Sequence, residues 1–302
     1  MAGGANPVKA IIAALFANGA IAIAKYVAAV ITGSGSMLAE AVHSTADCGN
    51  QALLLLGLKK AKQPPSPDYP LGYGKETYFW SFIVALMLFS LGGLFSVYEG
   101  WHKLHEPEPL SYPFIALGVL AFGIIAEAMS MRACVQEVNK VRGRQSLWQW
   151  FRQSRNAELV VIFGEDLAAL LGLSFAFVAV LVAWLTGNPM YDAIGSIAIG
   201  VLLIVVAVFV GVEVKAMLVG QGVEERTRQD MIGFLEQQPD VHKVFNCLTL
   251  QLGPDVMVAV KVKMRPLVSA NDLIDAINRT EAAFKQQFPD VLWLFFEPDH
   301  KD

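Results

Sequence analysis

The 302-residue sequence has few charged residues and few cysteines. Charged residues make up 17% of the chain, against roughly 25% in an average soluble protein. This shortage argues against a soluble globular protein, a disordered chain and a nucleic-acid-binding protein. The three cysteines, Cys48, Cys134 and Cys247, lie far apart and form no CxxC pair. The sequence therefore contains no disulfide framework, and we expect each cysteine to pack as a small apolar side chain.

Long apolar segments dominate the first 220 residues. Hydrophobic residues make up 55% of the chain, and its mean hydropathy is +0.47. A bilayer core of about 30 Å is crossed by about 20 helical residues. Six segments are long enough, namely residues 8–31, 36–58, 78–101, 112–134, 157–186 and 189–218. We predict an all-α six-helix transmembrane bundle over residues 1–222.

Positive charges lie mainly in two of the predicted connections. The second and fourth connections hold most of them, at Lys59, Lys60, Lys62, Lys75, Arg132, Lys140, Arg142, Arg144, Arg152 and Arg155. Because cytoplasmic loops are enriched in lysine and arginine, these connections and both termini are expected in the cytoplasm. The predicted protein is multi-pass, and its location is the cell (inner) membrane if the source is bacterial.

The pattern changes after residue 222. The expected elements are a helix at 223–238, strands at 243–252 and 255–265, a helix at 269–288 and a strand at 291–296. Ser269 is expected to cap the second of these helices. Val256, Val258, Val260 and Val262 alternate, which places them on one face of a strand. We predict a small cytoplasmic α+β domain of order αββαβ over 223–302, which dimerisation would help to stabilise.

Ionisable residues inside the apolar segments are the candidates for function. Each costs roughly 2.5–3.5 kcal/mol at the bilayer centre. Lys25, Lys215, Glu99 and Glu213 lie near segment ends, where we expect them to extend to the membrane surface. No basic residue is then expected at the midplane. The deeper groups are His43, Asp47, Glu127, Glu165 and Asp166.

The second and fifth segments bring such groups to one depth. His43 and Asp47 are four residues apart and share a helix face, which Asn50 continues. Counted from opposite membrane surfaces, Asp47 and Asp166 lie about 16 and 14 Å deep. This arrangement suits zinc or another first-row divalent metal, and a structural hydrogen bond between helices is the alternative. Glu127 fits either a charge at a segment end or a group on the transport path.

Three motifs carry a family resemblance. The segment SMLAEAVHSTADCGNQ (36–51) resembles the second span of the cation diffusion facilitators, which are proton-coupled exporters of zinc and related divalent metals. The loop PDYPLGYGKE (67–76) is similar to the family signature between spans two and three, and NPMYD (188–192) resembles the entry to span six. The resemblance implies a transporter rather than an enzyme, and a homodimer formed through the tail.

The resemblance also implies a tetrahedral transport site made of two ligand pairs, on spans two and five. His43 and Asp47 match the first pair, and Asp166 matches the last member of the second. Ile162 stands where the family usually has histidine or aspartate, and isoleucine cannot coordinate a metal.

Several groups are candidates for the missing ligand. Glu165, Asn50 and water are the nearer ones, with Glu127 a remoter option. We favour Glu165, although adjacent helical residues point about 100° apart. A local helix bulge near Gly164 would make it easier for Glu165 and Asp166 to share one site.

Two accessory metal sites of the family are not expected here. In the 67–76 loop Asp68 is retained, but Tyr69 and Tyr73 replace common histidines. The tail has Glu297 as its one ligand-type residue at the approximate family positions, and the others are Phe245, Lys261 and Phe295. We therefore do not expect metal regulation through the tail, and His242 and His300 fit surface histidines.

The predicted function is metal–proton exchange by alternating access, with no bound cofactor. Zinc is the expected ion, and manganese, iron, cobalt and nickel are alternatives because carboxylate-rich sites favour harder ions. A membrane-embedded metal-dependent hydrolase is a rival from another class, although the sequence has no HExxH motif. A carrier of organic anions would need a basic group at the midplane. The lipid bilayer and protons are the remaining expected partners, and nucleic acid is not.

Overall fold

The computed structural model describes residues 5–32, 35–106 and 112–301, without the side chains of residues 32, 35–40, 42 and 43. The chain divides into two compact units. The helical unit comprises Met1–Leu58, Phe79–Arg152 and Ala157–Val214. The second unit comprises Lys59–Tyr78, Gln153–Asn156 and Lys215–Asp302, so two loops between helices group with the C-terminal part of the chain.

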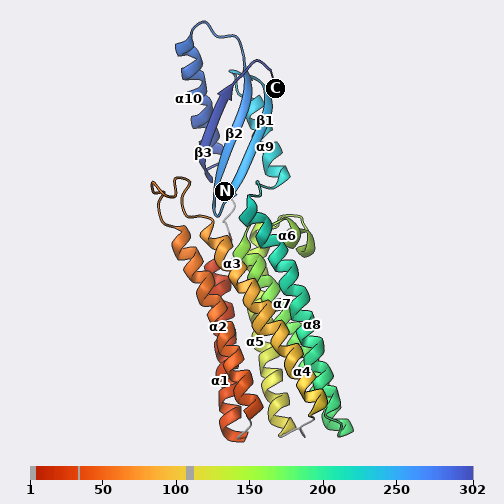
Figure 1. Cartoon of the computed structure of the whole chain (residues 1–302). Coiled ribbons are helices and arrows are strands. Elements are labelled where there is room, and N and C mark those ends of the chain that lie inside the picture. Colours follow the sequence, from red (N-terminus) through yellow and green to blue (C-terminus); the bar gives the residue numbers. More distant parts are fainter. Residues whose placement is uncertain (1–4, 33–34, 107–111, 302) are drawn as a thin grey trace. The chain divides into compact units, whose positions relative to one another are not determined.

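Long helices form the first 219 residues (Figure 1). In order they are α1 (Pro7–Thr32), α2 (Gly35–Ala61), α3 (Glu76–Met87), the π-helix η1 (Leu88–Leu94), α4 (Phe95–His105), α5 (Pro113–Val141), α6 (Leu147–Gln153), α7 (Ala157–Thr186) and α8 (Met190–Val219). Within the described residues, five segments are long and apolar enough to cross a membrane: α1, the continuous α3–η1–α4, α5, α7 and α8. The chain is therefore a multi-pass membrane protein.

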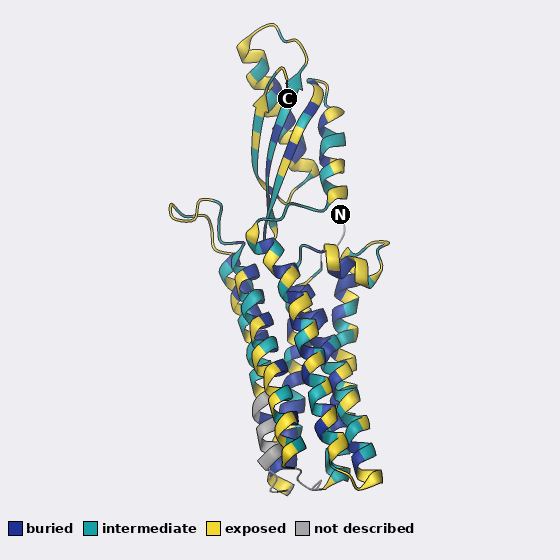
Figure 2. Ribbon diagram, turned by 45° about the vertical axis from the view of Figure 1, so that its right-hand side comes forward, coloured by how far each residue is buried: buried dark blue, intermediate teal, exposed yellow. Residues whose placement is uncertain are grey.

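The outer surfaces of these helices are apolar. Exposed residues follow the outside of the helical unit, while buried ones lie between its helices (Figure 2). Large side chains are among the exposed ones, including Phe16, Ile23, Ile125, Met129 and Leu185. Such faces would be unstable in water, and they match a hydrocarbon solvent in which each helix satisfies its own backbone hydrogen bonds.

Local sequence explains where α7 and α8 meet. Gly187 has a φ of +68°, the left-handed conformation that ends a helix readily only at glycine. The side chain of Asn188 then accepts a hydrogen bond from the backbone N–H of Met190 at 3.0 Å. This bond satisfies one of the free donors at the start of α8.

The third membrane segment differs from the uniform helix that the sequence predicts, because η1 interrupts it. Close packing accompanies this π-helix: a Cβ atom at Gly93 would lie 2.5 Å from Cγ1 of Ile204, and one at Gly200 would lie 2.6 Å from the backbone nitrogen of Val97. Small residues thus allow the third segment and α8 to approach closely, as is common between membrane helices.

Two further differences concern the fourth connection. α5 extends to Val141, beyond the predicted end at residue 134. The short helix α6, which the sequence analysis did not predict, buries Trp150 and Phe151. The ring of Trp150 meets that of Phe163 on α7 edge-on, with 5.9 Å between the ring centroids. α6 therefore forms where two aromatic side chains are buried against α7.

The C-terminal part forms a sheet with two helices, in the order α9 (Glu225–Glu236), β1 (Val241–Leu252), β2 (Asp255–Met264), α10 (Ala270–Gln287) and β3 (Val291–Pro298). Within the described chain the sheet order is β1-β2-β3, with β1 antiparallel and β3 parallel to β2. The parallel pair requires a crossover, which α10 provides. Ser269 caps α10, as predicted, by accepting the backbone N–H of Asp272 at 3.2 Å.

The core of this part lies between the sheet and the helices. The four alternating valines of β2 are all buried, as the sequence predicts, and they pack in one cluster with Phe284 of α10. Cys247 also belongs to this cluster, and burial raises the pKa of its thiol to about 11. Cys134 is buried in α5, and the three cysteines are free.

The 67–76 loop belongs to the second unit, where it packs on the turn between β1 and β2. The backbone N–H of Gly253 donates to the hydroxyl of Tyr78 at 2.9 Å. A Cβ atom at Gly74 would lie 1.9 Å from the carbonyl oxygen of Leu252, so this position requires glycine.

Replacing Phe284 with alanine should destabilise the C-terminal sheet. Phe284 is fully buried, and loss of such a ring costs about 3–5 kcal/mol. Hydrogen exchange of the β2 amides in the purified full-length protein should accelerate accordingly. Phe295→Ala is the matched control, because Phe295 is 54% exposed. Equal exchange rates in the two variants would contradict the packing described here.

Candidate functional site

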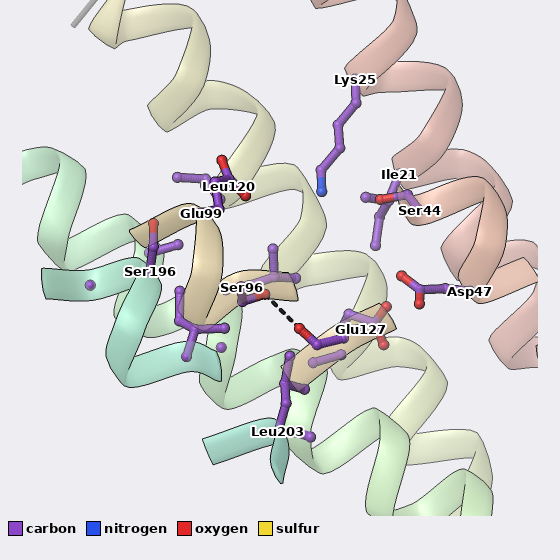
Figure 3. Close-up of a pocket in the computed structure, with 18 of the residues that line it drawn as sticks. Ile21, Lys25, Ser44, Asp47, Ser96, Glu99, Leu120, Glu127, Ser196 and Leu203 are labelled. Carbon is purple, nitrogen blue, oxygen red and sulfur yellow. Dashed lines mark hydrogen bonds between the residues drawn. The ribbon is translucent and has the colours of Figure 1, made fainter. Parts of the chain in front are cut away.

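Four carboxylates line the deep part of one cavity inside the helical unit. The cavity has a volume of about 220 Å³, and these four are Asp47 of α2, Glu127 of α5, and Glu165 and Asp166 of α7. Figure 3 shows the side chains of Asp47 and Glu127 in it. Glu127, Glu165 and Asp166 are no more than 5% exposed. α5 and α7, which carry three of these acids, are otherwise strongly apolar. Buried acids in such helices are costly and invite a functional explanation.

The cavity reaches one end of the helical unit. Its outer part is lined by Glu99 and Lys103 of α4 and Asp192 of α8, which lie where α4 ends and α8 begins. Lys103 Nζ is 3.1 Å from Glu99 Oε1 and 3.3 Å from Asp192 Oδ2. All three side chains are partly exposed, so this end forms the mouth of the cavity.

The opposite side is closed by packed side chains. Residues 157–164 of α7 are all buried, and none of them is among the described residues that line the cavity. A Cβ atom at Gly164 would lie 2.6 Å from Cγ2 of Val210, which reflects close contact between α7 and α8. The acidic groups are therefore reached from one side of the helical unit.

Amide and hydroxyl groups hold the two acids of α7. Asn50 Nδ2 donates to Glu165 Oε1 at 3.0 Å, and Gln51 Nε2 donates to Glu165 Oε2 at 3.0 Å. Ser130 Oγ donates to Asp166 Oδ2 at 3.0 Å. Adjacent acids thus have partners on different helices, α2 for one and α5 for the other.

α7 has no bulge near Gly164. α7 is a regular α-helix from Ala157 to Thr186, and both Glu165 and Asp166 line the cavity without any distortion. The cavity is wide enough to meet two neighbouring positions of one helix, so no change in helix geometry is needed.

Asn50 has a second polar atom that bears on the site. Its Oδ1 atom is buried and accepts no hydrogen bond within the described structure. A carbonyl oxygen in this state is costly to bury, and it is also a ligand that divalent cations accept. Asn50 therefore fits a ligand role as well as the positioning of Glu165.

The other predicted site residues have different positions. The side chain of His43 lies outside the described residues, although its backbone belongs to α2. Asp68 is exposed on the loop of the second unit. Ile162 is fully buried and does not line the cavity. Among the side chains that are described, no three of the types His, Cys, Asp and Glu form a ready-made metal centre.

The prediction for Lys25 is wrong. Rather than extending to the membrane surface, this side chain is 8% exposed and lines the cavity with the carboxylates. The sequence signal for its burial was its depth, because Lys25 lies seven residues before the end of an apolar helix. Sequence analysis also missed Ser130 and Asn18, whose Nδ2 donates to Gln51 Oε1 at 3.4 Å. Neutral polar residues in apolar helices carry too weak a signal to be singled out by composition.

The fold and this cavity are those of a multi-pass membrane protein with an acidic interior that suits cations. Residues 11–219 match the family model of the cation efflux transmembrane domain. The chain belongs to the cation efflux family, the cation diffusion facilitators that the sequence motifs indicated. Its members are transporters and not enzymes, which removes the hydrolase alternative.

Named relatives agree with this assignment. The human mitochondrial proton-coupled zinc antiporter SLC30A9 is 32% identical over 250 residues, which is 82% of this chain and 44% of that protein. Metal tolerance protein C4 of Arabidopsis thaliana is 30% identical over 82% of this chain and 54% of its own length. The cation-efflux pump FieF of Salmonella newport is 26% identical over 93% and 89%. The chain thus spans about half the length of the first two.

Replacing Gln51 with methionine should destabilise the helical unit. The change removes one of the two amide donors to the buried carboxylate of Glu165. Leaving such a group underbonded costs about 1–3 kcal/mol. Thermal unfolding of the purified protein in detergent should therefore shift to lower temperature. Gln63→Met, on an exposed loop, is the control, and an unshifted transition in Gln51→Met would contradict the hydrogen bonding.

Proposed function

We propose that the protein exports Zn²⁺ in exchange for protons. The observation that carries this proposal is the cavity lined by Asp47, Glu127, Glu165 and Asp166, which reaches one end of an apolar helical unit and is closed at the other. A cavity of this kind concentrates cations at a site that is open to one side at a time. The similarity to a relative named as a proton-coupled zinc antiporter supports both the ion and the counter-ion.

The proposed ligands are His43, Asp47, Glu165 and Asp166. Nitrogen and oxygen donors from α2 and α7 give the mixed set that Zn²⁺ accepts in four-coordinate sites. Glu165 is already held by two amides in a position that faces the cavity, which supports it as the replacement for the ligand that Ile162 cannot provide.

Three further groups are assigned accessory roles. Asn50 contributes its buried Oδ1 atom, and Glu127 lies on the path between the mouth and α7. Asp68, on its exposed loop, could assist only in attracting cations before they enter.

Proton exchange follows from the chemistry of the ligands. Zinc binds deprotonated carboxylate and neutral imidazole, so its arrival releases protons and its departure takes them up. His43 suits this cycle, because imidazole changes protonation near neutral pH. Protons entering through the open mouth compete for the same groups and expel the metal. The empty site then returns in its protonated form.

The orientation of the cavity supports an assignment of the transport state. The loops rich in lysine and arginine lie at the end opposite the mouth, so we assign the mouth to the non-cytoplasmic side. This conformation is then the outward-open one.

α2 serves as the sixth span, since its 27 residues extend about 40 Å. Both termini are cytoplasmic, and residues 223–302 form a domain that associates two chains into a homodimer.

Replacing Asp47 with asparagine should abolish zinc transport. The change keeps the size of the side chain and removes the negative charge that α2 contributes to the cavity. In proteoliposomes with an imposed pH gradient, zinc flux should fall about 100-fold, the upper end of the losses common when a group at a metal site is changed.

The matched control is Asp275→Asn, which removes a carboxylate from an exposed position of α10. It should retain most of the wild-type flux. Transport by Asp47→Asn at the wild-type rate would rule out the proposed site. The same assay with Mn²⁺, Fe²⁺, Co²⁺ and Ni²⁺ identifies the preferred ion.

A further inference from the structure

A lysine side chain lies in the acidic cavity. Lys25 of α1 is buried, and it points into the same cavity as the carboxylates of Asp47 and Glu127 (Figure 3). A buried ammonium in an apolar helix is as costly as a buried carboxylate. Its position among acids is therefore a feature that the metal ligands alone do not explain.

Contacts between helices place Lys25 beside the turn of α2 that carries Asp47. The neighbouring residue Tyr26 accepts a hydrogen bond from the hydroxyl of Thr45 at 3.4 Å. Thr45 lies two residues before Asp47, and the side chain of Ser44 also lines the cavity. In addition, α1 packs against both α5 and α7, the helices of the other three carboxylates.

Lys25 differs from the other lysine that lines the cavity. Lys103 lies at the mouth and forms ion pairs with Glu99 and Asp192. Lys25 instead lies deeper, where the facing acids are those proposed to meet the substrate. A divalent ion that reaches these acids enters the field of a fixed ammonium group.

The ammonium of Lys25 lowers the net negative charge that a bound metal ion meets. When all are ionised, Lys25 and the four deep carboxylates carry a formal charge of −3, and a bound divalent ion brings it to −1. Without the lysine, the site would retain two negative charges with the metal bound. It would hold the ion more tightly, because attraction inside a partly desolvated cavity is weakly screened.

We propose that Lys25 is a tethered cation that competes with the transported metal for the deep carboxylates and so sets its affinity. The ammonium offsets part of their charge when the site is empty, and it repels the divalent ion when the site is filled. Release into the mouth is thereby accelerated. This inference rests on the proposed function and adds an affinity-determining residue to it.

The test compares zinc transport by Lys25→Met with that of the wild type in proteoliposomes. Removal of the charge should lower the KM for Zn²⁺ about tenfold and also lower the maximal rate, because release slows. A zinc titration of the purified protein should give a Kd that falls by a similar factor. Lys25→Arg, which keeps the charge, should remain close to the wild type in both measurements.

Lys215→Met is the matched control, since Lys215 is exposed on α8 and does not line the cavity. It should leave KM and Kd unchanged. A KM and Kd in Lys25→Met that equal or exceed those of the wild type would overturn the inference. Wild-type protein that binds zinc but does not transport it would contradict the proposed function instead, and the Kd comparison would still decide the role of Lys25.

A measurement on the wild type removes any dependence on variant folding. Acetic anhydride should acetylate Lys25 several-fold faster in the presence of zinc, because the metal displaces the ammonium from the carboxylates. Mass spectrometry gives the rate at each lysine, with Lys215 as the internal reference. An unchanged or slower rate at Lys25 would overturn the inference.

Discussion

The burial of acidic side chains inside an apolar helical unit is the constraint on which the rest of the structure depends. Each carboxylate must find donors or a cation, because hydrocarbon offers neither. The helices meet this need with neutral polar side chains. Two amides of α2 donate hydrogen bonds to Glu165, and a hydroxyl of α5 donates one to Asp166. The same bonds join α2, α5 and α7, so the site also contributes to how the helices pack.

A second consequence concerns the negative charge of the acids, which these hydrogen bonds do not neutralise. Hydrogen bonds from neutral donors orient a carboxylate but do not cancel its charge, and four such groups share one cavity. Positive charge from solvent or substrate completes the balance, and Lys25 contributes a fixed part of it from α1. Under the proposed function, binding and release become a competition among metal ions, protons and a tethered ammonium. That competition is what an exchanger requires.

Packing also determines which side reaches the site. Small residues bring α8 close to the third membrane segment and to α7, and buried apolar residues fill the start of α7. The same acids therefore lie at the bottom of a cavity open at one end. Alternating access would require these tightly packed contacts to be exchanged for others at the mouth, where Lys103 already joins α4 to α8.

The amino-acid sequence by itself determined the membrane class, the long apolar segments, the valine face of β2, the cap at Ser269 and the acids of α2 and α7, because hydropathy and residue spacing act locally. Tertiary structure decided which groups meet. No periodicity places Lys25 among carboxylates, assigns Asn50 and Gln51 to Glu165, or makes a helix bulge at Gly164 unnecessary. Those outcomes depend on the rotation of each helix against its neighbours, which close packing between distant segments sets.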